Sequence, residues 1–371
     1  MISLAPQLDF KKALLLLLVS FLFVAFACWG QQVPNKLLQP AEGDYIAHDF
    51  HFRSGETLPE LRLHYLTFGK PQRDAEGRTT NAILILHGTG GSGRQFLQPQ
   101  FANELFGPGQ PLDVGRYFIV LPDNVGHGKS SKPSDGMHAH FPQYDYDDMV
   151  AAQHDLLQKG LGVNHLRLVM GTSMGCMHSW VWMESFPDFM DAGMPLACLP
   201  VQIAGRNRIW RKMTIEGIRQ DPEWKNGDYA TEPRAALQVV TDFLLIAGST
   251  PLPMQIQYPT RDSADKYLDD YVKRVTAALD ANDFLYAVSS SRNYDPSPQL
   301  DKISVPVMFV NSADDFINPP ELGIAEREIK RVKRGMFVLI PTSERTHGHG
   351  THTWAVFWKQ YLQELLQESE R

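Results

Sequence analysis

Five short runs of consecutive apolar residues recur along the chain, separated by polar segments and by segments with helical spacing. Continuous apolar sequence is typical of strands in a parallel sheet, because helices cover both faces of such a sheet. A helical repeat of apolar residues from Tyr146 to Leu161 falls between the second and third runs. Strand, helix and strand in this order predict an α/β fold, with a mostly parallel central sheet flanked by helices. The predicted buried strands are residues 81–86, 116–121, 166–170, 305–310 and 336–340.

An earlier segment, Leu61–Phe68, alternates instead, and places Leu61, Leu63 and Tyr65 on one face. Alternation is typical of a strand that is buried on one face only. We therefore predict an outer antiparallel strand here, at the edge of the sheet.

Residues 201–300 contain few strand-like runs but several helical ones, interrupted near Pro251 and Pro253. The simplest interpretation is a helical lid inserted into one α/β core. The core would then have a first part at 41–200 and a second part at 301–371.

The N-terminus has the pattern of a targeting sequence. Lys11 and Lys12 precede an apolar run of 14 residues, Ala13 to Phe26. As a helix this run would extend only about 21 Å, short of the roughly 30 Å hydrocarbon core of a bilayer. With the small residues Ala25 and Ala27 around Phe26, it predicts a signal peptide at 1–27 and export to the periplasm or the medium, with no stable membrane span after cleavage. An uncleaved anchor, or a lipid anchor through Cys28, stays open.

Composition narrows the class of protein. The 371 residues are 43% hydrophobic and 21% charged, with a net charge of −7, as expected of a globular protein. A mildly acidic chain without a basic run gives no reason to expect nucleic-acid binding. Three cysteines are too few for a disulfide framework. We interpret Cys176 and Cys198 as small buried residues, and their pairing stays open, as does the oligomeric state.

The motif G-x-S-x-G occurs at Gly171–Gly175, directly after the predicted strand 166–170, and a helical pattern follows it. A tight turn between strand and helix holds such a serine in a strained conformation and exposes its hydroxyl at the edge of the sheet. Ser173 is therefore the candidate nucleophile. A serine hydroxyl is a weak nucleophile until a base removes its proton, so a histidine and an acid are needed nearby.

In this arrangement the acid and the base follow the serine along the chain. Asp314 and Asp315 come directly after the predicted strand 305–310. We prefer Asp315 as the acid, because Asp-x-Ile-x-Pro is the usual pattern of a strand-end acid in proteins of this kind. Asp314 is then a turn or cap residue.

Three histidines, His347, His349 and His352, follow the predicted strand 336–340. We prefer His349 as the base because it stands between two glycines, and His352 is the second choice. His347 is interpreted as a solvated loop residue. A zinc site is the weaker interpretation, because the nearest carboxylate is Glu344 and the HExxH motif is absent.

The substrate oxyanion also needs hydrogen-bond donors. A glycine-rich segment, 88–93, follows the first buried strand, and we assign the backbone N–H groups of Thr89 and Met174 as the donors. The segment lacks the Lys-Ser/Thr ending of a P-loop and the G-x-G-x-x-G spacing, so we do not expect nucleotide binding. We expect no cofactor and no metal.

Beyond these motifs, the chain from about Leu61 onward resembles the homoserine O-acetyltransferase branch of the α/β-hydrolase superfamily. The resemblance implies an α/β-hydrolase fold with Ser173 as nucleophile, Asp315 as acid and His349 as base. Two features depart from that family: Thr172 stands where glycine is usual, and residues 235–258 of the predicted lid do not follow its pattern. The resemblance is carried by Phe106–Gly109, Asp123–Gly126, Gly128–Ser131, Asp148–Gln153, Gly171–Gly175, Asp221-Pro222 with Trp224, Gly227 and Tyr229, and Asp280–Tyr286.

Together these features predict an exported serine hydrolase that cleaves an ester or related acyl bond of a small-molecule substrate. The alternative is an acyltransferase that moves the acyl group to an alcohol acceptor, as the resemblance implies. Both reactions use the same three side chains. Export favours hydrolysis, because acetyl-CoA and homoserine are cytoplasmic metabolites.

Overall fold

The computed structural model describes residues 39–370. The predicted signal peptide, 1–27, and Cys28 lie outside the described residues.

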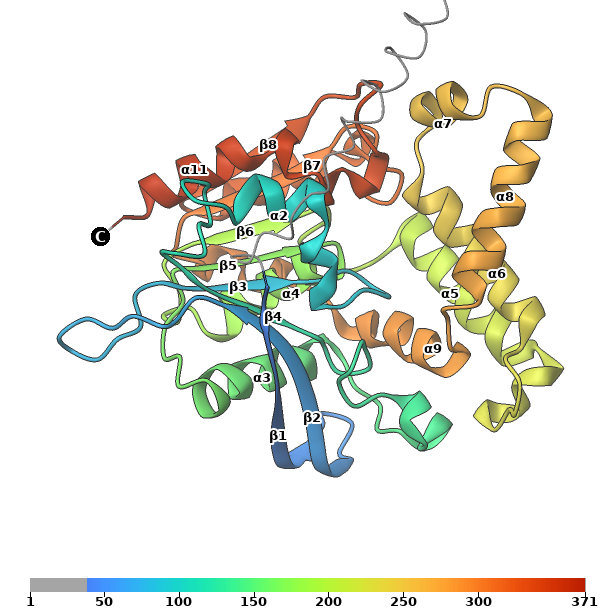
Figure 1. Cartoon of the computed structure of the whole chain (residues 1–371), viewed down its shortest axis with the longest axis horizontal. Helices are drawn as coiled ribbons and strands as arrows, with labels where there is room; N and C mark the ends of the chain where they lie inside the picture. Colours follow the sequence, from blue (N-terminus) through green and yellow to red (C-terminus); the bar gives the residue numbers. More distant parts are fainter. Residues whose placement is uncertain (1–38, 371) are drawn as a thin grey trace, which may run out of the picture. The chain divides into compact units, whose positions relative to one another are not determined.

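Within the described part of the chain, eight strands form one sheet in the order β1-β2-β4-β3-β5-β6-β7-β8 (Figure 1). The six strands from β4 across to β8 are parallel, whereas β2 pairs antiparallel with both β1 and β4. The predicted α/β architecture, with a mostly parallel central sheet, is confirmed. The strands are β1 (Ala41–His51), β2 (Thr57–Phe68), β3 (Ala82–Leu86), β4 (Phe118–Pro122), β5 (Leu168–Thr172), β6 (Gly193–Leu196), β7 (Val307–Ser312) and β8 (Gly335–Ile340).

Helices cover both faces of this sheet. On one face α4 packs against β3, β5 and β6, and α3 packs against α4; α2 and α11 lie on the other face (Figure 1). Strands β3 to β7 are buried along their whole length, which explains their continuous apolar sequence. The helices are α2 (Pro99–Leu105), α3 (Tyr146–Asp155), α4 (Met174–Ser185), α5 (Gly205–Gln220), α6 (Arg234–Gly248), α7 (Pro251–Gln257), α8 (Arg261–Thr276), α9 (Ala281–Ser289), α10 (Ile324–Glu328) and α11 (Lys359–Glu368).

The prediction that Leu61–Phe68 forms the edge strand is wrong in one respect. This segment is the antiparallel strand β2, but β1 pairs with it along its outer side and is itself the edge. In β1 only Ala47 and Phe50 are buried, so the strand has no apolar pattern from which it could be predicted. Backbone pairing with β2 runs along the strand, and only Ala47 and Phe50 of β1 add buried side chains to the core.

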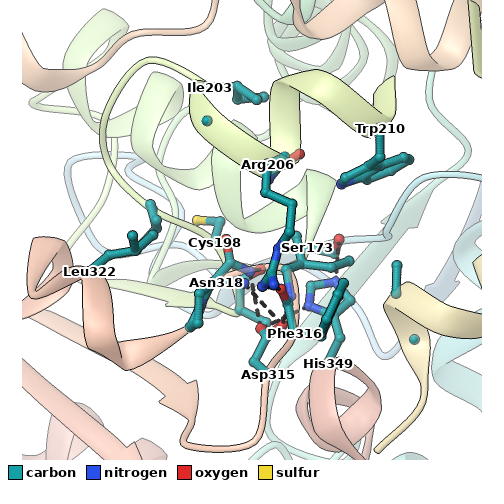
Figure 2. A pocket seen from close by; sticks show the side chains of 18 of the residues that line it. Ser173, Cys198, Ile203, Arg206, Trp210, Asp315, Phe316, Asn318, Leu322 and His349 are labelled. Atoms are coloured by element: carbon teal, nitrogen blue, oxygen red, sulfur yellow. Dashed lines mark hydrogen bonds and ion pairs between the residues drawn. The ribbon is translucent and has the colours of Figure 1, made fainter. Parts of the chain in front are cut away.

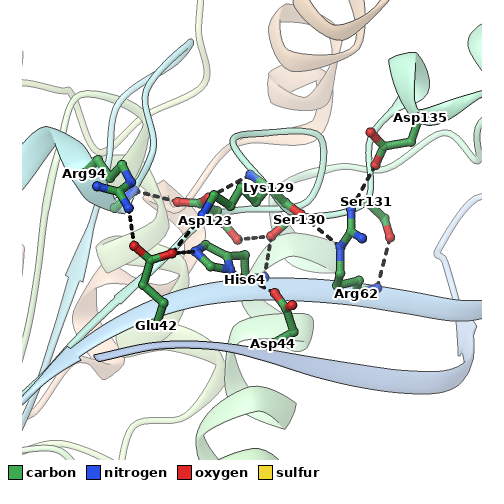
Figure 3. A network of polar contacts seen from close by, with 11 residues as sticks. Glu42, Asp44, Arg62, His64, Arg94, Asp123, Lys129, Ser130, Ser131 and Asp135 are labelled. Carbon is green, nitrogen blue, oxygen red and sulfur yellow. Dashed lines mark hydrogen bonds and ion pairs between the residues drawn. The ribbon is translucent and has the colours of Figure 1, made fainter. Parts of the chain in front are cut away.

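Side chains of β1 and β2 also join a polar network with the loop that follows β4 (Figure 3). Glu42 pairs with Arg94 and accepts a hydrogen bond of 2.8 Å from Lys129 Nζ. The imidazole of His64 is buried and contacts Asp44 Oδ1 at 2.8 Å through Nδ1. These contacts connect β1, the edge strand, to the rest of the fold.

The helices α5 to α9 lie between β6 and β7 in the sequence, and the predicted helical runs of the insertion correspond to α5, α6 and α8. In the structure α6 packs against both α5 and α8, beside the sheet (Figure 1). The interruption predicted near Pro251 is the break between α6 and α7. Pro251 stands in the first turn of α7, where its missing N–H leaves no helical hydrogen bond unmade.

No single helix within residues 39–370 has the length and apolar composition needed to cross a membrane. Only α6 and α7 taken together meet that test, and the pair is bent by 104°.

One half-buried acid on α4, Glu184, gives a pH-dependent contribution to stability. Burial, together with the negative charges of Asp147 and Asp295, raises the pKa of Glu184 from 4.5 to about 8. Between these pH values the folded protein holds a proton that the unfolded chain has lost. The free energy of unfolding therefore falls as pH rises through this window.

We expect Glu184→Gln to remove this decline and to raise the free energy of unfolding by about 1–3 kcal/mol near neutral pH. Urea unfolding of both proteins at a series of pH values measures the difference. The exposed Glu364→Gln on α11 is the control, since it removes a carboxylate that is not buried. Parallel stability curves for Glu184→Gln and the original protein would contradict the assignment.

Candidate active site

Ser173 lies at the turn between β5 and α4, with φ 54° and ψ −109°, a strained conformation for a residue with a side chain. Two glycines make this turn possible. A Cβ on Gly171 would lie 2.1 Å from the carbonyl oxygen of Gly175, and a Cβ on Gly175 would lie 1.9 Å from the carbonyl oxygen of Leu86 in β3. The predicted G-x-S-x-G turn is therefore present, and both flanking glycines are required by close backbone contacts.

Three predicted residues meet at the carboxyl edge of the sheet, from the ends of β5, β7 and β8 (Figure 2). His349 Nε2 lies 2.8 Å from Ser173 Oγ, and His349 Nδ1 lies 2.9 Å from Asp315 Oδ2. With Nδ1 protonated and donating to Asp315, Nε2 is free to accept the proton of the serine hydroxyl. The structure thus places His349 between Ser173 and Asp315, which is the arrangement that nucleophilic catalysis needs.

The carboxylate of Asp315 is buried but fully hydrogen-bonded. Burial alone would raise its pKa, yet the neighbouring His349 and the hydrogen bonds from His349 and Asn318 outweigh it, so the pKa of Asp315 lies below its usual value. The backbone N–H groups of Ile317 and Asn318 and the amide Nδ2 of Asn318 all donate to it, at 2.8–3.1 Å. Asp315 is thus a charged, fixed partner for the imidazole. Sequence reasoning had not assigned Asn318 a role.

Asp314, predicted to be a turn or cap residue, ties two loops together. Its Oδ2 accepts a hydrogen bond of 2.8 Å from Thr346 Oγ1 and one of 3.2 Å from the N–H of Gly348. Both donors belong to the loop that carries His349. Asp314 therefore positions the histidine loop, while its neighbour Asp315 contacts the histidine itself.

The other two histidines of the cluster do not contact the serine. His347 stacks on Trp354, with ring centroids 4.1 Å apart. His352 lies edge-on to His349 at 5.0 Å, and burial together with the charge of His349 lowers its pKa to about 3. His352 is thus a neutral ring packed against His349.

Both predicted oxyanion donors belong to segments next to the serine. Met174 is the first residue of α4, and N–H groups in the first turn of a helix have no intrahelical partner. Thr89 lines the same cavity as Ser173, and a Cβ on the preceding Gly88 would lie 3.3 Å from Ser173 Cβ. The loop after β3 therefore passes close to the nucleophile, as an oxyanion site requires.

A buried histidine supports that loop. His87 Nδ1 contacts the carbonyl oxygen of Gly88 at 2.8 Å, and Nε2 accepts a hydrogen bond from the N–H of Asn124 at 3.1 Å. Burial lowers the pKa of His87 to about 4, so the ring is neutral and can donate through one nitrogen while it accepts through the other. His87 thus connects the loop that carries Thr89 to the segment that follows β4.

Cys176 on α4 and Cys198, two residues after β6, form a disulfide with Cα atoms 5.8 Å apart. The pairing that the sequence left open is thus present in the structure. A cross-link spanning 22 residues stabilises the fold by about 3 kcal/mol, chiefly by restricting the unfolded chain. It also ties the helix behind Ser173 to the neighbouring strand.

A cavity of about 910 Å³ opens beside Ser173 and His349. One wall comes from α5, α6 and the α6–α7 connection, and the opposite wall from the loop after β7. Its lining is mainly apolar, and includes Ile203, Trp210, Leu244, Phe284, Phe316 and Leu322. Within residues 39–370 no group of three or more His, Cys, Asp or Glu side chains is arranged to hold a metal ion.

A family model described as alpha/beta hydrolase fold matches residues 81–346. The chain belongs to the α/β-hydrolase family. Within that family it is 29% identical over 313 residues to the homoserine O-acetyltransferase of Pelobacter propionicus. The aligned region covers 74% of this chain and 82% of the relative. The predicted resemblance to this branch of the α/β hydrolases is confirmed.

Solved α/β-hydrolase structures with low sequence identity show the same fold. Homoserine O-acetyltransferase from Bacillus anthracis superposes with a TM-score of 0.77 at 21% identity, covering 88% of this chain and 97% of its own. An acetylester hydrolase from Corynebacterium glutamicum superposes with a TM-score of 0.76 at 20% identity, covering 88% of this chain and 96% of its own. These two similarities show the shared fold. The family match and the relative from Pelobacter propionicus agree with the predicted enzyme class, esterase-like or acyltransferase.

Proposed function

We propose that this protein is an exported serine hydrolase that cleaves an ester bond through an acyl-enzyme on Ser173. The observation that carries the proposal is the imidazole of His349, which bridges Ser173 Oγ at 2.8 Å and Asp315 Oδ2 at 2.9 Å. Distances of this length allow direct proton transfer between nucleophile and base.

In the proposed reaction His349 Nε2 takes the proton of Ser173 as Oγ attacks the ester carbonyl. Asp315 stabilises the imidazolium that forms, and its charge is maintained by a lowered pKa. The N–H groups of Thr89 and Met174 bind the oxyanion of the tetrahedral intermediate. His349 then protonates the departing alcohol, and an activated water releases the acid from Ser173. In this proposal the insertion, 201–300, acts as a lid over the cavity.

The disulfide supports both export and hydrolysis. Disulfides persist in oxidising compartments and are rare in the cytosol. Together with the predicted signal peptide at 1–27, the Cys176–Cys198 bond favours a protein that works away from cytoplasmic acetyl-CoA.

A second candidate function is acyl transfer to an alcohol, which is favoured by the similarity to the homoserine O-acetyltransferase of Pelobacter propionicus. Transfer and hydrolysis share the acyl-enzyme and differ in what attacks it. Transfer requires that the cavity bind an alcohol acceptor and exclude water.

The two functions are separated by following the acyl group. Purified mature protein is incubated with para-nitrophenyl acetate or with acetyl-CoA, with and without homoserine, and free acetate and O-acetylhomoserine are quantified. We expect acetate to account for nearly all of the acetyl group released from the ester, at a rate that homoserine does not change. O-acetylhomoserine as the main product would establish acyl transfer instead.

A further inference from the structure

Two arginines line the catalytic cavity, Arg206 and Arg211. Arg211 is buried and its guanidinium donates to Asn207 Oδ1 and Ser291 Oγ, whereas Arg206 is exposed. Arg206, in the first turn of α5, extends from the insertion toward the loop that carries Asp315 (Figure 2). Within residues 39–370 no carboxylate lies within ion-pair distance of its guanidinium. Its charge is therefore available to a ligand in the cavity.

The guanidinium is held in a defined plane. Its Cζ lies 3.7 Å from the ring centroid of Phe316, and Nη2 donates a hydrogen bond of 2.5 Å to the carbonyl oxygen of Phe316. Stacking on the ring and one bond to the backbone leave Nε and Nη1 available for a planar oxyanion. Because Phe316 follows Asp315 directly, the cation is fixed beside the catalytic residues.

The acids on the cavity wall do not cancel this charge. Asp315 is buried and bonded to His349 and Asn318, and Asp314 is bonded to Thr346 and Gly348. Glu321 also lines the cavity and, like Arg206, is exposed to solvent, but among the ion pairs within residues 39–370 none joins it to the guanidinium. Most other groups around Arg206 are apolar, among them Ile203, Trp210 and Leu322 (Figure 2). An apolar wall strengthens the attraction between a cation and a bound anion, because it replaces water.

From this geometry we propose that Arg206 binds a carboxylate of the substrate, and that the preferred substrates are esters that carry a carboxylate group. The proposal rests on the proposed ester cleavage at Ser173. It assigns Arg206 as a specificity-determining residue and the apolar wall as the site for the uncharged part of the same molecule.

Matched pairs of esters test the proposal. The first pair places the carboxylate in the acyl part: mono-para-nitrophenyl succinate against para-nitrophenyl butyrate. The second places it in the alcohol part: para-acetoxybenzoate against its methyl ester. In Arg206→Gln, we expect kcat/KM to fall roughly tenfold to a hundredfold for the carboxylate ester of at least one pair, and by less than about twofold for its uncharged partner.

Two further variants test whether the effect is specific to the guanidinium of Arg206. Arg206→Lys keeps the charge but loses the planar fork, so it should restore part of the preference for the carboxylate ester. Arg208→Gln is the matched control, since Arg208 is exposed on the same helix but does not line this cavity, and both kcat/KM values should stay unchanged. Equal losses for charged and uncharged esters in Arg206→Gln, or no loss for either carboxylate ester, would overturn the proposal.

Binding without turnover separates this proposal from the proposed function. Calorimetric titration of the protein with succinate should show binding that Arg206→Gln weakens and Arg208→Gln does not. Succinate binding without hydrolysis of any ester would refute the proposed function and leave the anion site standing. Hydrolysis of uncharged esters without succinate binding and without a carboxylate preference would refute the role of Arg206 alone.

Discussion

Ser173→Ala should lower ester turnover roughly 10³- to 10⁶-fold, because the variant has no atom that can form the acyl-enzyme. The melting temperature should stay close to that of the original protein. Within residues 39–370 the side-chain hydroxyl has one hydrogen-bond partner, His349 Nε2 at 2.8 Å, and its loss leaves that nitrogen beside the open cavity. Initial rates with para-nitrophenyl acetate measure the effect.

Ser185→Ala is the control for this substitution. Ser185 is the exposed last residue of the helix that begins after Ser173, so its loss should leave turnover unchanged. A fluorophosphonate probe followed by peptide mass spectrometry should modify Ser173 in the original protein and no residue in Ser173→Ala. Near-normal esterase turnover in Ser173→Ala would show that another group is the nucleophile.

Gly175→Ala should be strongly destabilising. The added Cβ would lie 1.9 Å from the carbonyl oxygen of Leu86, the last residue of β3, and 2.8 Å from Leu86 Cβ. Neither contact can be relieved by turning a flexible side chain, so α4 must move away from β3. We expect a loss of about 3 kcal/mol or more in the free energy of unfolding, and a misplaced Ser173 in any protein that still folds.

Gly217→Ala makes the same chemical change where there is room. The nearest atom to the added Cβ would be Val239 Cγ1 at 3.8 Å, and the position lies inside α5. Alanine should therefore stabilise the protein by about 0.5–1 kcal/mol through its higher helix propensity. Urea unfolding of both variants tests the pair. Equal stability of Gly175→Ala and Gly217→Ala would show that the turn tolerates a side chain.

The parts of the fold that the sequence predicted are those where burial dictates composition. Strands β3, β4, β5 and β7 are covered on both faces, so apolar residues run along them without a break. Edge strand β1 was missed because one of its sides faces solvent and its pairing uses backbone groups, which every residue supplies.

In the predicted active site, too, some features leave a local sequence pattern and others do not. Ser173 could be located because its turn needs glycines on both sides, and glycines are visible in a sequence. The choice among three histidines depends on the path of a loop, which Asp314 fixes through bonds to Thr346 and Gly348. Those bonds join residues more than thirty positions apart, and no local pattern reports them. Arg206 was missed for a similar reason, since its neighbour Phe316 lies 110 residues away.

The sulfur atoms beside the nucleophile have a practical consequence for chemical probing. Cys198 lines the cavity, yet its sulfur is bonded to that of Cys176, so the part of the chain from 39 to 370 presents no reduced thiol to an electrophile. Alkylating reagents that would normally compete for a nearby cysteine therefore have no target there. Covalent inhibitors with serine-directed warheads can be screened on the oxidised protein without a thiol-blocking step, and adding reductant to such a screen would create a second reactive atom in the same pocket.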